Sequence, residues 1–244
     1  MNDSGREMAD IETSSDGYAA RFSGAVGAWM LGVQSGLTLK LLAGSGAKTV
    51  LDVGGGHGQL TGPLLDAGYQ VTVLGSDASC GNRIASHIAS GAVAFQTGDV
   101  VALPFEDRSF DAAISFRLLP HCERWAALIR ELCRVARTTV VVDYPTSQSF
   151  NALGPLFFGA KKKLEGNTRA WRDFRHEEVR GAFEAQGFRV TARRGQFFFP
   201  MALHRMLKCP ALSRCLEAVP SVLTLRSRFG SPVILCAESE REEK

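Results

Sequence analysis

The 244-residue sequence contains six cysteines, and none of them forms a C-x-x-C pair or combines with histidine at a metal-ligand spacing. This absence argues against a disulfide framework and against a structural zinc site, because both need cysteines at characteristic spacings. We therefore expect reduced thiols, a cytoplasmic protein and no bound metal.

The first residues are not expected to form a secretory leader. Residues 1–17 are polar and acidic, which predicts a disordered tail. The most apolar stretch near this end, residues 24–43, contains Gln34 and Lys40, so it predicts a packed helix rather than a membrane span. Repeats are absent too, and residues 18–237 are expected to form one domain, with a charged tail over 238–244.

Charge is unevenly distributed along the chain, although the net charge is only +3. Residues 1–150 carry 11 Lys/Arg against 15 Asp/Glu, whereas residues 151–230 carry 15 Lys/Arg against 6 Asp/Glu. The basic back half indicates an anionic substrate, an anionic membrane surface or RNA. The alternative is a solvated basic surface without a ligand.

β-rich and helix-like segments alternate along the sequence. Helix-like segments cover 59–67, 81–90, 121–136, 176–186 and 200–223. Seven strand-like segments precede, separate and follow them, at 48–53, 70–75, 92–96, 110–116, 138–144, 188–191 and 231–237. This order favours an α/β fold, a doubly wound and mostly parallel sheet with helices on both faces. Insertions at 146–175 and 197–228 are expected to cover the functional edge of the sheet like lids.

Residues 51–60, LDVGGGHGQL, run from a strand directly into four glycines. Glycine tolerates positive φ and lets a ligand approach the backbone, which is typical of a nucleotide or nucleoside site. The dinucleotide pattern G-x-G-x-x-G does not fit, because from Gly54 and Gly56 the next required glycine falls on Gln59. The Gly-Lys-Ser/Thr of a phosphate-binding loop is absent.

The pattern present is Asp52-x-Gly54-x-Gly56-x-Gly58, followed by Asp77 after the second strand. Asp99 then stands in TGDVVALPFEDRSFDAAIS at 97–115, and a later helix carries the sequence ELCRV at 131–135. In this order, over residues 48–143, the motifs resemble those of class I S-adenosylmethionine-dependent methyltransferases.

The resemblance implies a Rossmann-like, seven-stranded sheet with an N-terminal helix, and S-adenosylmethionine as cofactor. It divides the domain into a cofactor-binding half at 48–145 and a substrate-side half at 146–230. The residues that it places on the cofactor are Asp52, Gly54, Gly55, Gly56, Gly58, Asp77, Ala78, Asp99, Val100 and Phe116.

The sequence departs from the family pattern at two places. The junction between the long helix and the next strand, Arg137-Thr138, lacks the usual glycine, and Asp77 comes late, after Gly75-Ser76. Asp111, at the start of the fourth strand, is expected to be structural.

The catalytic residues are harder to predict, because the sulfonium already activates the methyl group and the protein mainly aligns the acceptor. His121 is the candidate base, since imidazole titrates near neutral pH, although it could simply open the helix behind Pro120. Arg117 could fix an anionic acceptor or make a surface ion pair.

The acceptor is expected to be a small or lipid-like molecule. Residues 156–175 and 197–208 mix aromatic and basic groups. One interpretation is an amphipathic lid that admits an apolar acceptor at a membrane surface. The other is an ordinary set of core aromatics with a solvated basic face. An RNA or protein methyltransferase is the alternative, although SFRLLPH at 115–121 lacks the Asn/Asp-Pro-Pro-aromatic motif of amino-methylating nucleic-acid enzymes. A non-catalytic cofactor-binding scaffold and a nicotinamide dehydrogenase are further alternatives. The oligomeric state is not indicated.

Overall fold

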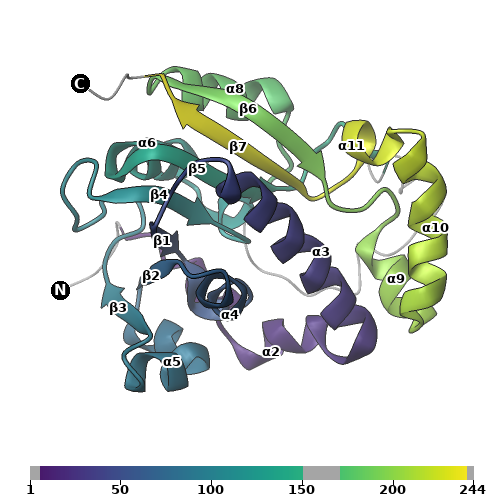
Figure 1. The fold of residues 1–244 in the computed structure, drawn as a ribbon, viewed down its shortest axis with the longest axis horizontal. Helices are drawn as coiled ribbons and strands as arrows, with labels where there is room; N and C mark the ends of the chain where they lie inside the picture. The colour runs from purple at the N-terminus through teal and green to yellow at the C-terminus, as the bar shows by residue number, and fades with distance from the viewer. Residues whose placement is uncertain (1–5, 151–170, 241–244) are drawn as a thin grey trace.

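The computed structural model describes residues 6–150 and 171–240 of the chain, which form a seven-stranded sheet in the order β3-β2-β1-β4-β5-β7-β6 (Figure 1). The first five strands along the chain pair in parallel, and β7 is antiparallel to both β5 and β6. The strands are β1 Thr49–Val53, β2 Gln70–Gly75, β3 Val93–Thr97, β4 Phe110–Ser115, β5 Ala136–Tyr144, β6 Phe188–Gly195 and β7 Val233–Ser239. The predicted α/β fold is confirmed.

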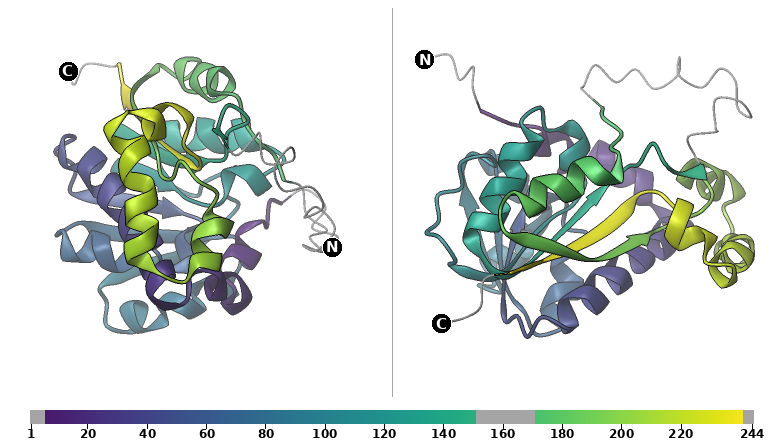
Figure 2. Two further views of the ribbon diagram at one scale, coloured as in Figure 1. Left: turned by 90° about the vertical axis from the view of Figure 1, so that its right-hand side faces the viewer. Right: turned by 90° about the horizontal axis from the view of Figure 1, so that it is seen from above.

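Helices cover both faces of this sheet, as the views in Figure 2 show. The α-helices are α1 Asp10–Thr13, α2 Asp16–Ala19, α3 Gly24–Ala43, α4 Thr61–Asp66, α5 Ala85–Ala89, α6 Trp125–Val135, α8 His176–Glu184, α9 Met201–Leu207, α10 Pro210–Val222 and α11 Leu225–Phe229. The short 3-10 helices are η1 Ala20–Phe22, η2 Gly55–His57, η3 Ala78–Ile84 and η4 Leu119–His121.

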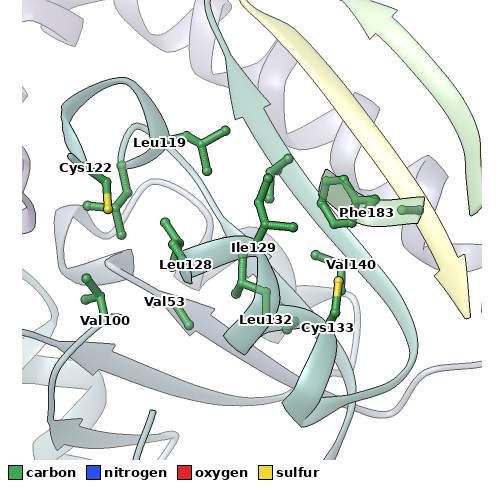
Figure 3. Packing of buried hydrophobic residues seen from close by; sticks show 14 of the residues in the cluster. Val53, Val100, Leu119, Cys122, Leu128, Ile129, Leu132, Cys133, Val140 and Phe183 are labelled. Atoms are coloured by element: carbon green, nitrogen blue, oxygen red, sulfur yellow. The ribbon is translucent and has the colours of Figure 1, made fainter. Parts of the chain in front are cut away.

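One face of the sheet is packed by α6 and α8. Leu128, Ile129, Leu132 and Val135 of α6 recur at helical spacing, and all four are fully buried. Figure 3 shows α6 side chains between the strands and Phe183 of α8. This cluster extends to Val100, which lies in the loop after β3. The core therefore fixes a loop at the carboxyl edge of the sheet.

The other face is packed by α3 and α4. The buried side of α3 includes Met30, Gln34, Thr38 and Leu42, which follow one another at every fourth position. By length and composition alone, α3 could cross a membrane. Here it packs against β5 and β7, with two polar side chains on its inner face, as expected for a packed helix.

The structure differs from the sequence-based expectations in its local detail. Residues 10–13 and 16–19 are helical, whereas the sequence predicted a disordered tail over 1–17; the Asp10 side chain bonds to the body of the domain. The expected helix over 121–136 begins only at Trp125, and β5 follows it directly at Ala136 without a turn. Pro220, expected to interrupt a helix, lies inside α10. Most of the lid predicted at 156–175 lies outside the described residues.

Candidate cofactor and active site

The glycine loop lies at the carboxyl end of β1, where ligands bind in open α/β sheets. Gly54 and Gly58 adopt left-handed conformations with φ of 77° and 71°, and η2 lies between them. A β-carbon would be strained at both positions, which explains these two glycines. The Gly54 N–H donates to the carbonyl oxygen of Leu74 at 2.8 Å, so the loop is fixed to the end of β2.

Two further glycines are needed for close packing. A β-carbon on Gly55 would lie 2.2 Å from the Asp52 carboxyl carbon, and one on Gly56 would lie 2.2 Å from the Cys80 carbonyl oxygen. Burial raises the pKa of Asp52 to about 7. Neither oxygen of this carboxyl has a hydrogen-bond partner among the described residues. An acceptor of this kind beside bare backbone suits a ligand with amino and hydroxyl donors, as S-adenosylmethionine has.

The acid after β2 lies at the surface. Asp77 stands two residues beyond the end of β2, and its Oδ1 accepts from the Ser79 N–H at 2.9 Å and from the Ser79 hydroxyl at 2.6 Å. These bonds cap η3, which starts at Ala78, and they lower the pKa of Asp77. The carboxylate is therefore held ionised at the surface beyond the end of β2, and its ribose-binding role remains a prediction.

The acid after β3 lies closer to the core. Asp99 accepts from the Val101 N–H at 3.1 Å and lies 3.6 Å from a guanidinium nitrogen of Arg124, while Val100 beside it is fully buried. Phe116, at the end of β4, is also fully buried. The structure thus brings an acid and apolar groups to the expected adenine side, where their contact with the cofactor remains a prediction.

The loop that follows Asp99 is braced by the Glu131–Arg134 pair of α6. Glu131 accepts from the Leu103 N–H at 2.9 Å, and Arg134 donates to the carbonyl oxygens of Leu103 and Phe105 at 2.9 and 2.8 Å. The two side chains bond to each other at 2.8 Å. The ELCRV segment therefore acts by holding the adenine-side loop.

The N-terminal segment covers the glycine loop. Asp10 is fully buried; its carboxylate accepts from the Ser76 N–H at 2.7 Å, from the Ser76 hydroxyl, and from the Cys80 thiol at 3.4 Å. The Asp10 β-carbon lies 3.5 Å from where a β-carbon on Gly54 would stand. Residues 10–14 therefore occupy space directly against the loop.

Strands β4 and β5 end in a buried polar cluster. Arg117 has φ of 61°, a strained conformation for a non-glycine residue of the kind found at functional sites. Its N–H donates to Asp143 Oδ1 at 2.6 Å, its Nε lies 3.5 Å from Asp143 Oδ2, and its Nη2 donates to Gln34. Burial raises the pKa of Asp143, and Arg117 opposes this shift. Arg117 is thus a buried ion-pair partner, not a surface one.

Two histidines lie around this cluster. Burial, together with the Arg117 charge, lowers the pKa of His57 to about 4, so this ring is neutral at physiological pH. His121 ends η4, and its ring lies edge-on to Trp171 with centroids 5.2 Å apart. The structure places His121 beside the carboxyl ends of the strands, while its catalytic role remains a prediction.

Aromatic side chains continue the site away from the loop. The Phe22 ring lies 5.2 Å from the Arg117 guanidinium, and Trp29 and Phe197 pack with centroids 5.3 Å apart. Together with Tyr18 and Met30, they form an apolar wall beside the polar cluster. Phe22, Met30 and Phe197 are buried, so an acceptor could contact this wall only if the structure opens there.

Other chemistry is not gathered at this edge. In residues 6–150 and 171–240, no three His, Cys, Asp or Glu side chains are grouped as metal ligands. A cleft of 280 Å³ between α8 and β6 includes His176, Arg180 and Arg193 but none of the predicted site residues. Asp111 accepts from the Lys48 and Thr49 N–H groups, both at 2.9 Å, as a structural residue would.

Sequence reasoning missed four residues that the structure brings to the site, namely Asp10, Tyr18, Gln34 and His57. Only His57 carried a signal, since it lies inside the glycine motif. The others come from the N-terminal segment and α3, and their contacts with the loop depend on the tertiary fold.

Comparison with known proteins agrees with this geometry. Residues 51–141 match a family described as "Methyltransferase domain". Residues 51–141 thus carry the methyltransferase domain, of the class I S-adenosylmethionine-dependent kind, that the sequence motifs predicted. This match agrees with the predicted cofactor and enzyme class.

Two curated relatives show how far the similarity extends. An uncharacterised methyltransferase of Mycobacterium avium is 39% identical over 95 residues, which cover 37% of this chain and 36% of that protein. The ubiquinone biosynthesis O-methyltransferase of Sinorhizobium fredii is 29% identical over 162 residues, 63% of this chain and 64% of that protein. The chain thus aligns with about a third of the first relative and less than two thirds of the second.

Solved structures share the fold at low identity. The magnesium protoporphyrin IX methyltransferase of Synechocystis PCC 6803, with bound S-adenosylhomocysteine, has a TM-score of 0.64 and 16% identity over 95% of this chain and 98% of that one. The [4+2]-cyclase SpnF has a TM-score of 0.56 and 21% identity over 84% of this chain and 79% of that one.

Proposed function

We propose that this protein transfers a methyl group from S-adenosylmethionine to a small-molecule or lipid-like acceptor. The observation that carries the proposal is the methyltransferase domain over residues 51–141, with its glycine loop at the carboxyl end of β1. Asp52 and the glycines would hold the methionine part, Asp77 and Ala78 the ribose, and Asp99, Val100 and Phe116 the adenine. When bound, the sulfonium of the cofactor supplies the activated methyl group.

The acceptor would bind between the polar cluster and the apolar wall. Phe22 and Phe197 are buried in this structure and would line the apolar side of the acceptor site once it opens, with the buried Arg117 and Asp143 at its edge. His121 is placed to accept a proton from a hydroxyl or amine acceptor, and Arg117 to fix an anionic part. The names of the ubiquinone and protoporphyrin methyltransferases support an acceptor with an apolar body. The proposal includes a peripheral membrane contact and a cytoplasmic location.

Cofactor entry requires the N-terminal segment to move, on this proposal. Asp10 is fully buried against Ser76, the residue after β2, and Ser14 lies close to Gly56. The segment competes with the cofactor for the same face of the loop.

Label transfer tests the function. The protein is incubated with methyl-labelled S-adenosylmethionine and a cell extract, which is then separated into chloroform-soluble, aqueous small-molecule and acid-insoluble fractions. We expect label in the chloroform-soluble or aqueous small-molecule fraction, and excess S-adenosylhomocysteine should suppress it. Label confined to acid-insoluble material and removed by ribonuclease or protease would contradict the acceptor class. No label in any fraction, with cofactor binding intact, would favour the scaffold.

A further inference from the structure

Helices α9, α10 and α11 form a lobe on one side of the molecule, seen at the right of Figure 1. The lobe joins the end of β6 to the start of β7, and Gly195 pairs with Val233, which in turn pairs with Tyr144 at the carboxyl end of β5. The lobe therefore lies at the edge of the sheet that carries the site.

Helix α10 has its polar and apolar faces reversed. Its buried residues include Ser213 and Glu217, whereas Val219 and Val222 on its outer side are 65% and 81% exposed. A surface helix of a soluble protein normally shows the opposite pattern. Its outward face therefore indicates a partner that takes up apolar side chains.

The buried acid explains the inner face. The Glu217 carboxylate accepts from the Phe198 and Phe199 N–H groups at 2.9 Å each and bonds to His204 at 3.0 Å. These bonds anchor α10 to α9 and to the segment before it. The orientation of α10 is thus fixed, and its apolar side is held outward.

Exposed apolar side chains are concentrated on this lobe. Of the eight large hydrophobic residues exposed in the described chain, the lobe provides six: Met206, Leu212, Val219, Val222, Leu223 and Phe229. Residues 201–229 also contain five cations, namely Arg205, Lys208, Arg214, Arg226 and Arg228, and their one acid is the buried Glu217. The lobe therefore presents apolar and positive groups without an exposed carboxylate.

We infer that the α9–α11 lobe docks on an anionic lipid bilayer. Apolar side chains flanked by Lys and Arg are the composition of helices that lie in a membrane interface. Anionic headgroups neutralise cations near the surface, and the acyl boundary receives the apolar groups. This inference deepens the proposed peripheral membrane contact. Docking would hold the acceptor side of the protein next to a bilayer, and only this role of the docking rests on the proposed function.

Vesicle flotation of the full chain tests the inference. Vesicles of phosphatidylcholine alone are compared with vesicles that also contain phosphatidylglycerol. We expect binding to the anionic vesicles only, weakened at high salt, and loss of at least roughly tenfold in affinity for the double variant Val219→Glu/Val222→Glu. The matched control is Ser86→Glu/Ala89→Glu on α5, which makes the same charge change at exposed positions beyond the opposite edge of the sheet and should bind like the parent.

Three outcomes would overturn the inference. They are no binding to anionic vesicles, equal binding by the α10 double variant and the parent, and a dimer in lipid-free solution that this double variant dissociates. S-adenosylhomocysteine binding is measured on the same samples. Cofactor binding without vesicle binding would refute only the docking. Vesicle binding without cofactor binding would refute only the proposed function.

Discussion

Replacing Asp10 by alanine should tighten cofactor binding. The Asp10 carboxylate accepts three hydrogen bonds at the end of β2 and seals the glycine loop. On the proposal that this segment moves for the cofactor to enter, these bonds must break first, and their free energy is subtracted from the affinity. Alanine removes that competition and leaves the loop unchanged.

The magnitude follows from the bonds that are lost. One hydrogen bond to a charged acceptor contributes roughly 1.5–3 kcal/mol net, so the loss of one of the three already corresponds to roughly 10- to 150-fold in Kd. Titration calorimetry with S-adenosylhomocysteine measures the change. Amide hydrogen exchange of residues 54–58 without ligand should also become faster, because the segment that covers these residues opens more often.

A matched variant separates the seal from a general charge effect. Asp16→Ala removes a 95% exposed carboxylate from the same segment, where it pairs with Arg83. Exposed pairs contribute little, so its Kd should stay within about twofold of the parent. Weaker binding by Asp10→Ala would refute the reasoning and would make Asp10 a ligand of the cofactor instead.

Three further predictions concern the acids and the braced loop. Asp77→Ala should weaken S-adenosylhomocysteine binding by roughly 1–3 kcal/mol, and an unchanged calorimetric Kd would remove Asp77 from the site. The raised pKa of Asp52, about 7, means that folded protein keeps a proton that unfolded protein has released, so stability is lost as pH rises. Between about pH 4 and 7, the free energy of unfolding of the parent, measured with urea, should fall by about 1.4 kcal/mol per pH unit relative to that of Asp52→Asn. Parallel pH profiles of the two proteins would contradict this. Arg134→Ala should lower the unfolding free energy by roughly 1–3 kcal/mol, because two loop carbonyls lose their donor. Arg130→Ala, at an exposed position of the same helix, should change it by less than about 0.5 kcal/mol. Equal effects of the two substitutions would contradict the bracing role of Arg134.

The sheet could be predicted from sequence because its strands are short β-rich segments that alternate with helix-like ones. The strand predicted over 138–144 lies within β5, and the strand predicted over 70–75 has the same bounds as β2. The glycine loop was equally accessible, since positive φ at Gly54 and Gly58 demands glycine locally.

The covering segment could not be predicted in this way. Residues 1–17 are polar and acidic, which indicates disorder when they are considered alone. Asp10 is ordered by donors on Ser76 and Cys80, more than sixty residues away in the sequence. Arg117 is a similar case, because only the fold brings Gln34 and Asp143 to its guanidinium.

The measurement that tests the central claim is a calorimetric titration with S-adenosylhomocysteine, with NADH titrated in parallel. The parent should bind the first saturably and not the second. Gly56→Ala should lose binding while staying folded by circular dichroism, because its β-carbon would lie 2.2 Å from the Cys80 carbonyl oxygen and 2.6 Å from the Ser14 hydroxyl oxygen. Gly62→Ala in α4, where a β-carbon meets open space, should bind like the parent. Saturable NADH binding without S-adenosylhomocysteine binding, or parental affinity in a folded Gly56→Ala variant, would contradict the account.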